Sequence, residues 1–104
     1  MFWLKAKGFF LGPDLELKNH LDNEGRLTLW PSKRTLQLLA LDYLATKFEV
    51  GVVYSEKKVN VLLNSWHIFG DSALLRRELY ERGLFNRHKD GAEYWRTPNT
   101  KFIE

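Results

Sequence analysis

The spacing of apolar residues in the central part of the chain predicts a helix over residues 33–47. Apolar side chains recur there at intervals of three and four residues, which is the period of a helix with one buried face. The positions of that face are Leu36, Leu39, Ala40, Tyr43 and Leu44. Ser32 stands directly before the helix, where a serine hydroxyl accepts a hydrogen bond from a free amide of the first turn. We therefore expect Ser32 to be the N-cap.

Two further helices follow in the sequence. Ser55 is the expected N-cap of the second, and Glu56 occupies its first turn, where the helix dipole favours a negative charge. The apolar stripe of this helix consists of Val59, Leu62, Leu63 and Trp66. The third helix begins at Asp71 or Ser72 and runs to Gly83, because glycine is common where a helix ends in the left-handed region. Its inward positions are Leu74, Leu75 and Leu79.

A β-hairpin is predicted after the third helix. The tetrapeptide His88-Lys89-Asp90-Gly91 lies between two extended segments, and Asp-Gly in such a place is a strong signal for a tight turn. Tyr94 and Trp95 are neighbours on the returning strand. Their side chains are therefore expected to point to opposite faces of the hairpin.

The pattern is weaker before the first of these helices. Residues 14–21 suit a short helix capped by Asp14, although their leucines also alternate as they would in a strand. Gly25 is expected to supply a positive φ in a turn. Residues 26–30 alternate between polar and apolar side chains, which predicts a short strand ended by Pro31.

In this order, the elements predict an α+β domain of the winged helix-turn-helix class, with three core helices and a C-terminal β-hairpin wing. We assign residues 25–98 to this domain, residues 1–24 to an N-terminal extension that packs on the core, and residues 99–104 to a tail. The extension carries the large aromatic residues Phe2, Trp3, Phe9 and Phe10. Their favoured role is to enlarge the core, and the alternative is an exposed patch for dimerisation or a protein partner.

Length and composition limit the class of protein. A chain of 104 residues, of which 44% are hydrophobic, can form one domain with its own core but not a deep substrate cavity. It has no cysteine, which suits a reducing compartment. No apolar run approaches the roughly 20 residues of a membrane-spanning helix, and Lys5 and Lys7 interrupt the apolar N-terminus, unlike a signal peptide. We expect a cytoplasmic protein that does not enter the membrane.

Charge points to an anionic partner without requiring one. The net charge is +3, from 16 basic and 13 acidic residues, which is small for a DNA-binding protein. Arg76, Arg77 and Tyr80 share, with Ala73, the face of the third helix that lies opposite its leucines. This face could enter a DNA major groove with an arginine on a guanine edge. Alternatively, the arginines form local ion pairs with acidic neighbours such as Glu81, and both interpretations stay open.

The remaining candidate contacts are basic residues expected to hold DNA phosphates. They are Lys57, Lys58, Arg87, Lys89 and Arg96. Asp90 and Glu93 lie in the same hairpin and cancel part of its charge. A solvated turn without a ligand is therefore the alternative.

The sequence offers little support for catalytic or metal chemistry. His20, His67 and His88 lie far apart, without a cysteine or a second histidine at ligand spacing. No nucleophile and base in a known order and no glycine-rich phosphate loop occur, and Asp71 suits a helix cap better than a catalytic acid. We expect a protein that is not an enzyme and has no metal site or cofactor.

A set of short motifs resembles one bacterial family, domain of unknown function 2087. The motifs are Gly25-Arg26-Leu27, Trp30-Pro31, Tyr43-Leu44-Ala45, Tyr54-Ser55-Glu56, Val59-Asn60, Asp71, Leu75-Arg76-Arg77-Glu78-Leu79, Arg87, Asp90-Gly91 and Tyr94-Trp95-Arg96. The resemblance implies a winged-helix-like domain in a regulatory setting, often joined to an ArsR-type DNA-binding domain, and implies no catalytic residue. The family tends to have glutamate where Lys58 stands, and that glutamate could complete a capping box with Ser55.

Two hypotheses from different classes follow. In the first, the protein is a small non-enzymatic regulator that binds double-stranded DNA through the third helix and the hairpin wing. In the second, it is a protein-docking adaptor that uses a winged-helix scaffold on a transcription-related partner without binding nucleic acid. A homodimer would suit the first hypothesis, because one chain offers a single recognition helix.

Overall fold

The computed structural model describes residues 16–98. The expected cap at Asp14, the aromatic residues of the N-terminal extension and the tail at 99–104 lie outside the described residues. Within them the helices are α2 (Arg34–Ala45), α3 (Glu56–Trp66) and α4 (Ser72–Glu81), and the strands are β1 (Val53–Ser55), β2 (Phe85–Arg87) and β3 (Glu93–Arg96). The fold is α+β, as the sequence predicts. None of the helices among these residues is long and apolar enough to span a bilayer.

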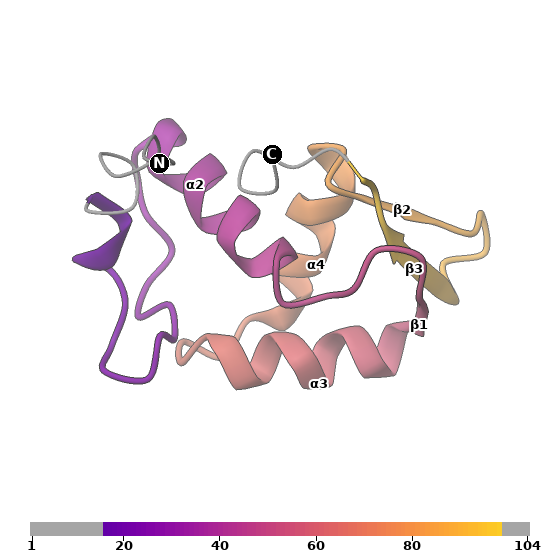
Figure 1. Ribbon diagram of the computed structural model, residues 1–104, viewed down its shortest axis with the longest axis horizontal. Helices are drawn as coiled ribbons and strands as arrows, with labels where there is room; N and C mark the ends of the chain where they lie inside the picture. Colours follow the sequence, from indigo (N-terminus) through magenta and orange to yellow (C-terminus); the bar gives the residue numbers. More distant parts are fainter. Residues whose placement is uncertain (1–15, 99–104) are drawn as a thin grey trace, which may run out of the picture.

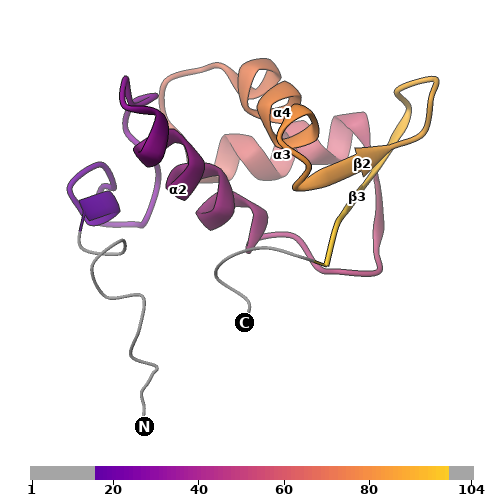
Figure 2. The same ribbon diagram turned by 90° about the horizontal axis from the view of Figure 1, so that it is seen from above.

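The β2–β3 hairpin projects at the end of the molecule opposite residues 16–30 (Figures 1 and 2). The strands form one antiparallel sheet in the order β1-β3-β2, so β3 lies in the middle. Strand β1 precedes α3, and its Val53 and Tyr54 pair with Trp95 and Tyr94 of β3. A three-residue strand is too short to show an alternating pattern, so its partner was not visible in the sequence.

The core lies where the helices meet the inner face of this sheet. Helix α4 packs against both α2 and α3, and its Leu75 and Leu79 are fully buried, as predicted. Phe48, just after α2, contacts Phe85 edge to face, with ring centroids 4.8 Å apart. Tyr94 is also buried on this face, whereas its neighbour Trp95 is only half-buried, so the two aromatic side chains separate as expected.

Three of the expected helix caps lie among the described residues, and two of these are confirmed. The Ser55 hydroxyl accepts a hydrogen bond from the Lys58 amide at 3.1 Å, and an Asp71 carboxylate oxygen accepts one from the Leu74 amide at 3.1 Å. The first cap therefore forms although Lys58 cannot complete a capping box.

The predicted cap at Ser32 is wrong. Lys33 occupies the N-cap position of α2 with extended backbone and no side-chain hydrogen bond to the helix. The helix begins one residue later than expected, which leaves the Ser32 hydroxyl one position too early for the free amides of the first turn.

The expected strand over residues 26–30 is also wrong in its extent. Only Leu27 pairs, through isolated bridges to Leu21 and His67. Leu27 is fully buried, but Leu29 is 49% exposed, so the alternating leucines do not share a buried face. Earlier in the chain, residues 16–18 form a helical turn, and Leu17 belongs to the core.

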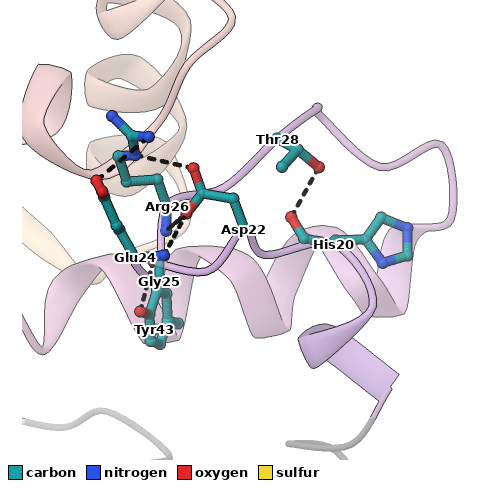
Figure 3. A network of polar contacts seen from close by, with 7 residues as sticks. All are labelled: His20, Asp22, Glu24, Gly25, Arg26, Thr28 and Tyr43. Carbon is teal, nitrogen blue, oxygen red and sulfur yellow. Dashed lines mark hydrogen bonds and ion pairs between the residues drawn. The ribbon is translucent and has the colours of Figure 1, made fainter.

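The turn before α2 is held by a network around Asp22 (Figure 3). One carboxylate oxygen of Asp22 accepts from the amides of Glu24 and Arg26, and the other accepts from Arg26 Nε at 2.8 Å. Gly25 has the expected positive φ, +79°, and its carbonyl accepts a hydrogen bond from the Tyr43 hydroxyl at 2.7 Å. A Cβ atom on Gly25 would lie 2.9 Å from that hydroxyl. Glycine is therefore required both for the backbone conformation and for the close approach of α2.

Candidate nucleic-acid interface

The outward face of α4 and the inner face of the hairpin meet in an open pocket of about 360 Å³. Its lining residues are Ala73, Arg76, Arg77, Tyr80 and Glu81 from α4, Arg87 from β2 and Tyr94 from β3. The prediction that Ala73, Arg76, Arg77 and Tyr80 share one face is confirmed. The structure adds that Arg87, from the hairpin, lines the same pocket.

The end of α4 brings the hairpin alongside that face. Gly83, with φ of +83°, donates a hydrogen bond to the Tyr80 carbonyl, and the next residue, Leu84, donates one to the Leu79 carbonyl. This pair of hydrogen bonds is the Schellman motif. It requires the residue after the helix to adopt the left-handed backbone conformation. The chain reverses there and enters β2, as the turn after α4 in Figure 2 shows. The first residue of β2, Phe85, is buried.

Arg76 is held by α3. Its Nη2 lies 3.1 Å from a carboxylate oxygen of Glu56, and its Nη1 donates a hydrogen bond to Asn60 Oδ1. The Arg76 side chain is only 19% exposed. Of the two interpretations for this residue, ion pairing is therefore the one observed, but its partners come from the neighbouring helix instead of from α4.

Arg77 is different, because its side chain is exposed and has no ion pair among residues 16–98. Glu78, the next residue along α4, accepts a hydrogen bond from Arg82 Nε at 2.8 Å. Arg82 also donates to Gln37 of α2 at 3.1 Å. The acidic residue nearest to Arg77 along α4 is thus engaged on the other side of the helix.

Arg87 is positioned by aromatic rings. Its guanidinium carbon lies 4.3 Å from the centroid of the Tyr80 ring, within the range of a cation–π interaction. The hydroxyl of Tyr94, more than that of Tyr80, raises the pKa of Arg87 against the opposing effect of desolvation. Tyr94 is also the cross-strand neighbour of Arg87, so both side chains project from the same face of the sheet.

Arg96 does not lie on the wing surface as expected. Its residue is 5% exposed, and its Nη1 donates a hydrogen bond to the Phe48 carbonyl at 2.7 Å. Burial lowers the pKa of this guanidinium. Side chains two apart on a strand share a face, so Arg96 points inward with Tyr94. The contact that we expected between Arg96 and a DNA phosphate is therefore contradicted by its position.

The other expected phosphate contacts are exposed. Lys57 and Lys58 lie in the first turn of α3, and Lys89 lies in the hairpin turn. None of the three has an ion pair among the described residues, and none lines the pocket. A carboxylate oxygen of Asp90, beside Lys89, lies 3.1 Å from Nδ1 of the exposed His88 side chain.

A buried histidine, His67, joins α3 to the residue that caps α4. This role was not predicted from the sequence. His67 Nδ1 lies 2.7 Å from the Leu63 carbonyl, and Nε2 accepts a hydrogen bond from the Asp71 amide at 2.9 Å. These partners require a neutral ring with its proton on Nδ1. The only sequence signal was position, because His67 directly follows the last turn of α3. Within residues 16–98, no three His, Cys, Asp or Glu side chains gather into a metal site.

A comparison of the chain with models of known families finds the family that the sequence motifs resemble. A family model described as an uncharacterized protein conserved in bacteria, DUF2087, matches residues 26–96. The chain belongs to the DUF2087 family. No curated protein and no solved structure matches it. The match spans α2, α3, α4 and the described sheet, and so includes both elements of the pocket.

The motifs that carry the DUF2087 resemblance have two kinds of role in the structure. Gly25 and Tyr43 join the turn before α2 to that helix, and Ser55 and Asp71 cap helices. A second set lines the pocket. It consists of Arg76, Arg77, Arg87 and Tyr94.

Proposed function

We propose that this DUF2087 protein is a small, non-enzymatic winged-helix regulator that binds double-stranded DNA across α4 and the β2–β3 hairpin. The element order supports the winged-helix assignment, because β1 and the hairpin form one sheet beside the pair α3 and α4. In such a domain α4 is the recognition helix and the hairpin is the wing.

One observation carries the proposal. Arg77 from α4 and Arg87 from the hairpin line the same open pocket, so two cations from separate elements face the same side of the molecule. In this arrangement Arg77 and Tyr80 contact the groove. The exposed side chains of Lys57, Lys58 and Lys89 contact phosphates around it.

The structure changes the roles of two arginines in this proposal. Arg76 supports the recognition helix, because Glu56 and Asn60 already engage its guanidinium. Arg96 stabilises the junction between the sheet and the end of α2 through the Phe48 carbonyl.

The experiment is an anisotropy titration of a labelled random duplex at two salt concentrations. Affinity should fall by about 0.9 log units per log unit of salt for each phosphate neutralised. The variant Arg77→Gln/Arg87→Gln should bind more weakly and with a smaller salt slope. Lys18→Gln/Arg34→Gln removes the same charge from exposed positions at the other end of the molecule, and should behave like the wild type. Equal effects of the two variants would reject the proposed interface.

A second candidate is a protein-docking adaptor acting on a transcription-related partner. It is favoured by the outer face of the sheet, where Val53 is 58% exposed and pairs in register with Trp95. Glu81 in the pocket and Glu93 in the hairpin also oppose phosphate. Absence of duplex binding at low salt, together with loss of a co-purified protein partner in Val53→Ser, would favour this candidate.

A further inference from the structure

We propose that the pocket between α4 and the hairpin is a binding site for one phosphoryl group, held by Arg77 and Arg87 with the hydroxyls of Tyr80 and Tyr94 as further donors. The inference rests on the proposed function for one source of that group, a DNA backbone. A free phosphate monoester would present the same chemistry.

The balance of charge in the pocket favours an anion. Glu56 lies 3.1 Å from Arg76 and offsets its charge. Arg77 and Arg87 then face a single lining carboxylate, that of Glu81. A guanidinium offers a planar set of N–H donors that matches the oxygens of a phosphoryl group. Two of them, from separate elements that line one pocket, can hold such a group together.

The pocket is also arranged before any ligand arrives. The Tyr80 ring holds the Arg87 guanidinium at 4.3 Å, and Tyr94, which also lines the pocket, is only 3% exposed and so is held by its surroundings. Ordering a long side chain on binding costs conformational entropy. Arg87 avoids part of that cost, so only Arg77 has to become ordered around the anion.

Shape distinguishes a phosphoryl group from a stacked base. One face of the Tyr80 ring is covered by the Arg87 guanidinium, so a base cannot stack on that face. The volume of about 360 Å³ lies near the lower end of small-ligand sites, roughly 300–1,000 Å³. An open pocket of this size admits a phosphoryl group that is still attached to a larger molecule.

Glu81 supplies a sharp test, because it lines the pocket and stands four residues after Arg77, where it can compete with an anion. The variant Glu81→Gln should bind inorganic phosphate more tightly. Glu93→Gln is the matched control, since Glu93 is an exposed hairpin residue outside the lining, and its phosphate affinity should equal that of the wild type.

The measurement is a titration with inorganic phosphate at constant ionic strength, followed by NMR of the arginine Nε–H groups and the backbone amides. The wild type should saturate, with shifts at Arg77, Arg87 and the hairpin. Arg77→Gln/Arg87→Gln should weaken binding by about tenfold or more, as expected when charge-assisted hydrogen bonds are lost. Lys18→Gln/Arg34→Gln carries the same charge change outside the pocket and should keep the wild-type affinity. Amide spectra of each variant verify the fold.

Linear shifts without saturation, or equal losses in the two double variants, would overturn the phosphoryl site. The same outcome follows if Glu81→Gln binds no more tightly than Glu93→Gln.

A random duplex, titrated in parallel, separates the two sources of the group. If phosphate saturates the pocket and Arg77→Gln/Arg87→Gln also loses the duplex, the site takes a backbone phosphate. If phosphate saturates but no duplex binds, the site stands with a free phosphate ester as its ligand, and the DNA proposal fails. If the duplex binds and phosphate does not saturate, the phosphoryl site fails and the DNA proposal survives.

Discussion

Arg76 is the residue for which a structural role and a DNA-reading role make opposite predictions. Its guanidinium joins α4 to Glu56 and Asn60 of α3. The Glu56 side chain is about half exposed, which limits the ion pair to about 0.5–1 kcal/mol. The hydrogen bond to Asn60 is charge-assisted and adds about 1.5 kcal/mol. Arg76→Ala should therefore lower the free energy of unfolding by about 2 kcal/mol.

Urea unfolding of Arg76→Ala, Asn60→Ala and the double variant measures the interaction directly. The coupling energy should be about 1–1.5 kcal/mol. Arg77→Ala is the matched control, because it makes the same change one residue along α4 at a side chain without an ion pair among the described residues. With Asn60→Ala it should be additive to within about 0.5 kcal/mol.

The two arginines should also separate in a duplex-binding titration. Arg77→Ala should weaken binding without changing stability, whereas Arg76→Ala should mainly change stability. The reasoning is refuted if Arg76 shows no more coupling to Asn60 than Arg77 does, or if Arg76→Ala weakens duplex binding at unchanged stability.

Three further predictions concern the scaffold. Arg96→Gln should lower stability by roughly 1.5–3 kcal/mol, because a buried carbonyl loses its charged donor, and should leave duplex affinity unchanged; paired urea and anisotropy titrations check both. Gly25→Ala should lower the free energy of unfolding by at least about 1 kcal/mol, because of its positive φ and the contact with Tyr43; an unchanged thermal midpoint would contradict this. Backbone hydrogen bonds, first that from Arg26, lower the pKa of Asp22 below the ordinary aspartate value of 3.8. The stability from Asp22 is therefore present above pH 3.8 and is lost as pH falls through the folded-state pKa, so Asp22→Asn should flatten the acid limb of a stability–pH curve.

Much of the fold follows from local signals in the sequence. The caps at Ser55 and Asp71 and the burial of Leu75 and Leu79 depend on residues within one or two helical turns. The same arithmetic placed Arg76, Arg77 and Tyr80 on one face, which the pocket confirms. The turn at Gly91 was equally visible, since Asp-Gly constrains the backbone locally.

The predictions that the structure contradicts failed because they depend on contacts between distant parts of the chain. The expected strand over 26–30 relied on alternation, yet burial of Leu27 and exposure of Leu29 depend on what packs against them. Arg96 was assigned to the wing because its residue type usually lies in water. Its actual place depends on the Phe48 carbonyl, 48 residues earlier in the chain.

By itself, the sequence determined the α+β class, the caps at Ser55 and Asp71, the hairpin turn and the face that carries Arg77, because each depends on the geometry of a few consecutive residues. Tertiary structure decided which cations remain available. Glu56 and Asn60 engage Arg76, the core takes Arg96, and the reversal at Gly83 brings the hairpin to α4. Such pairings join residues far apart in the chain, and no periodicity in one segment encodes the partner that another segment supplies.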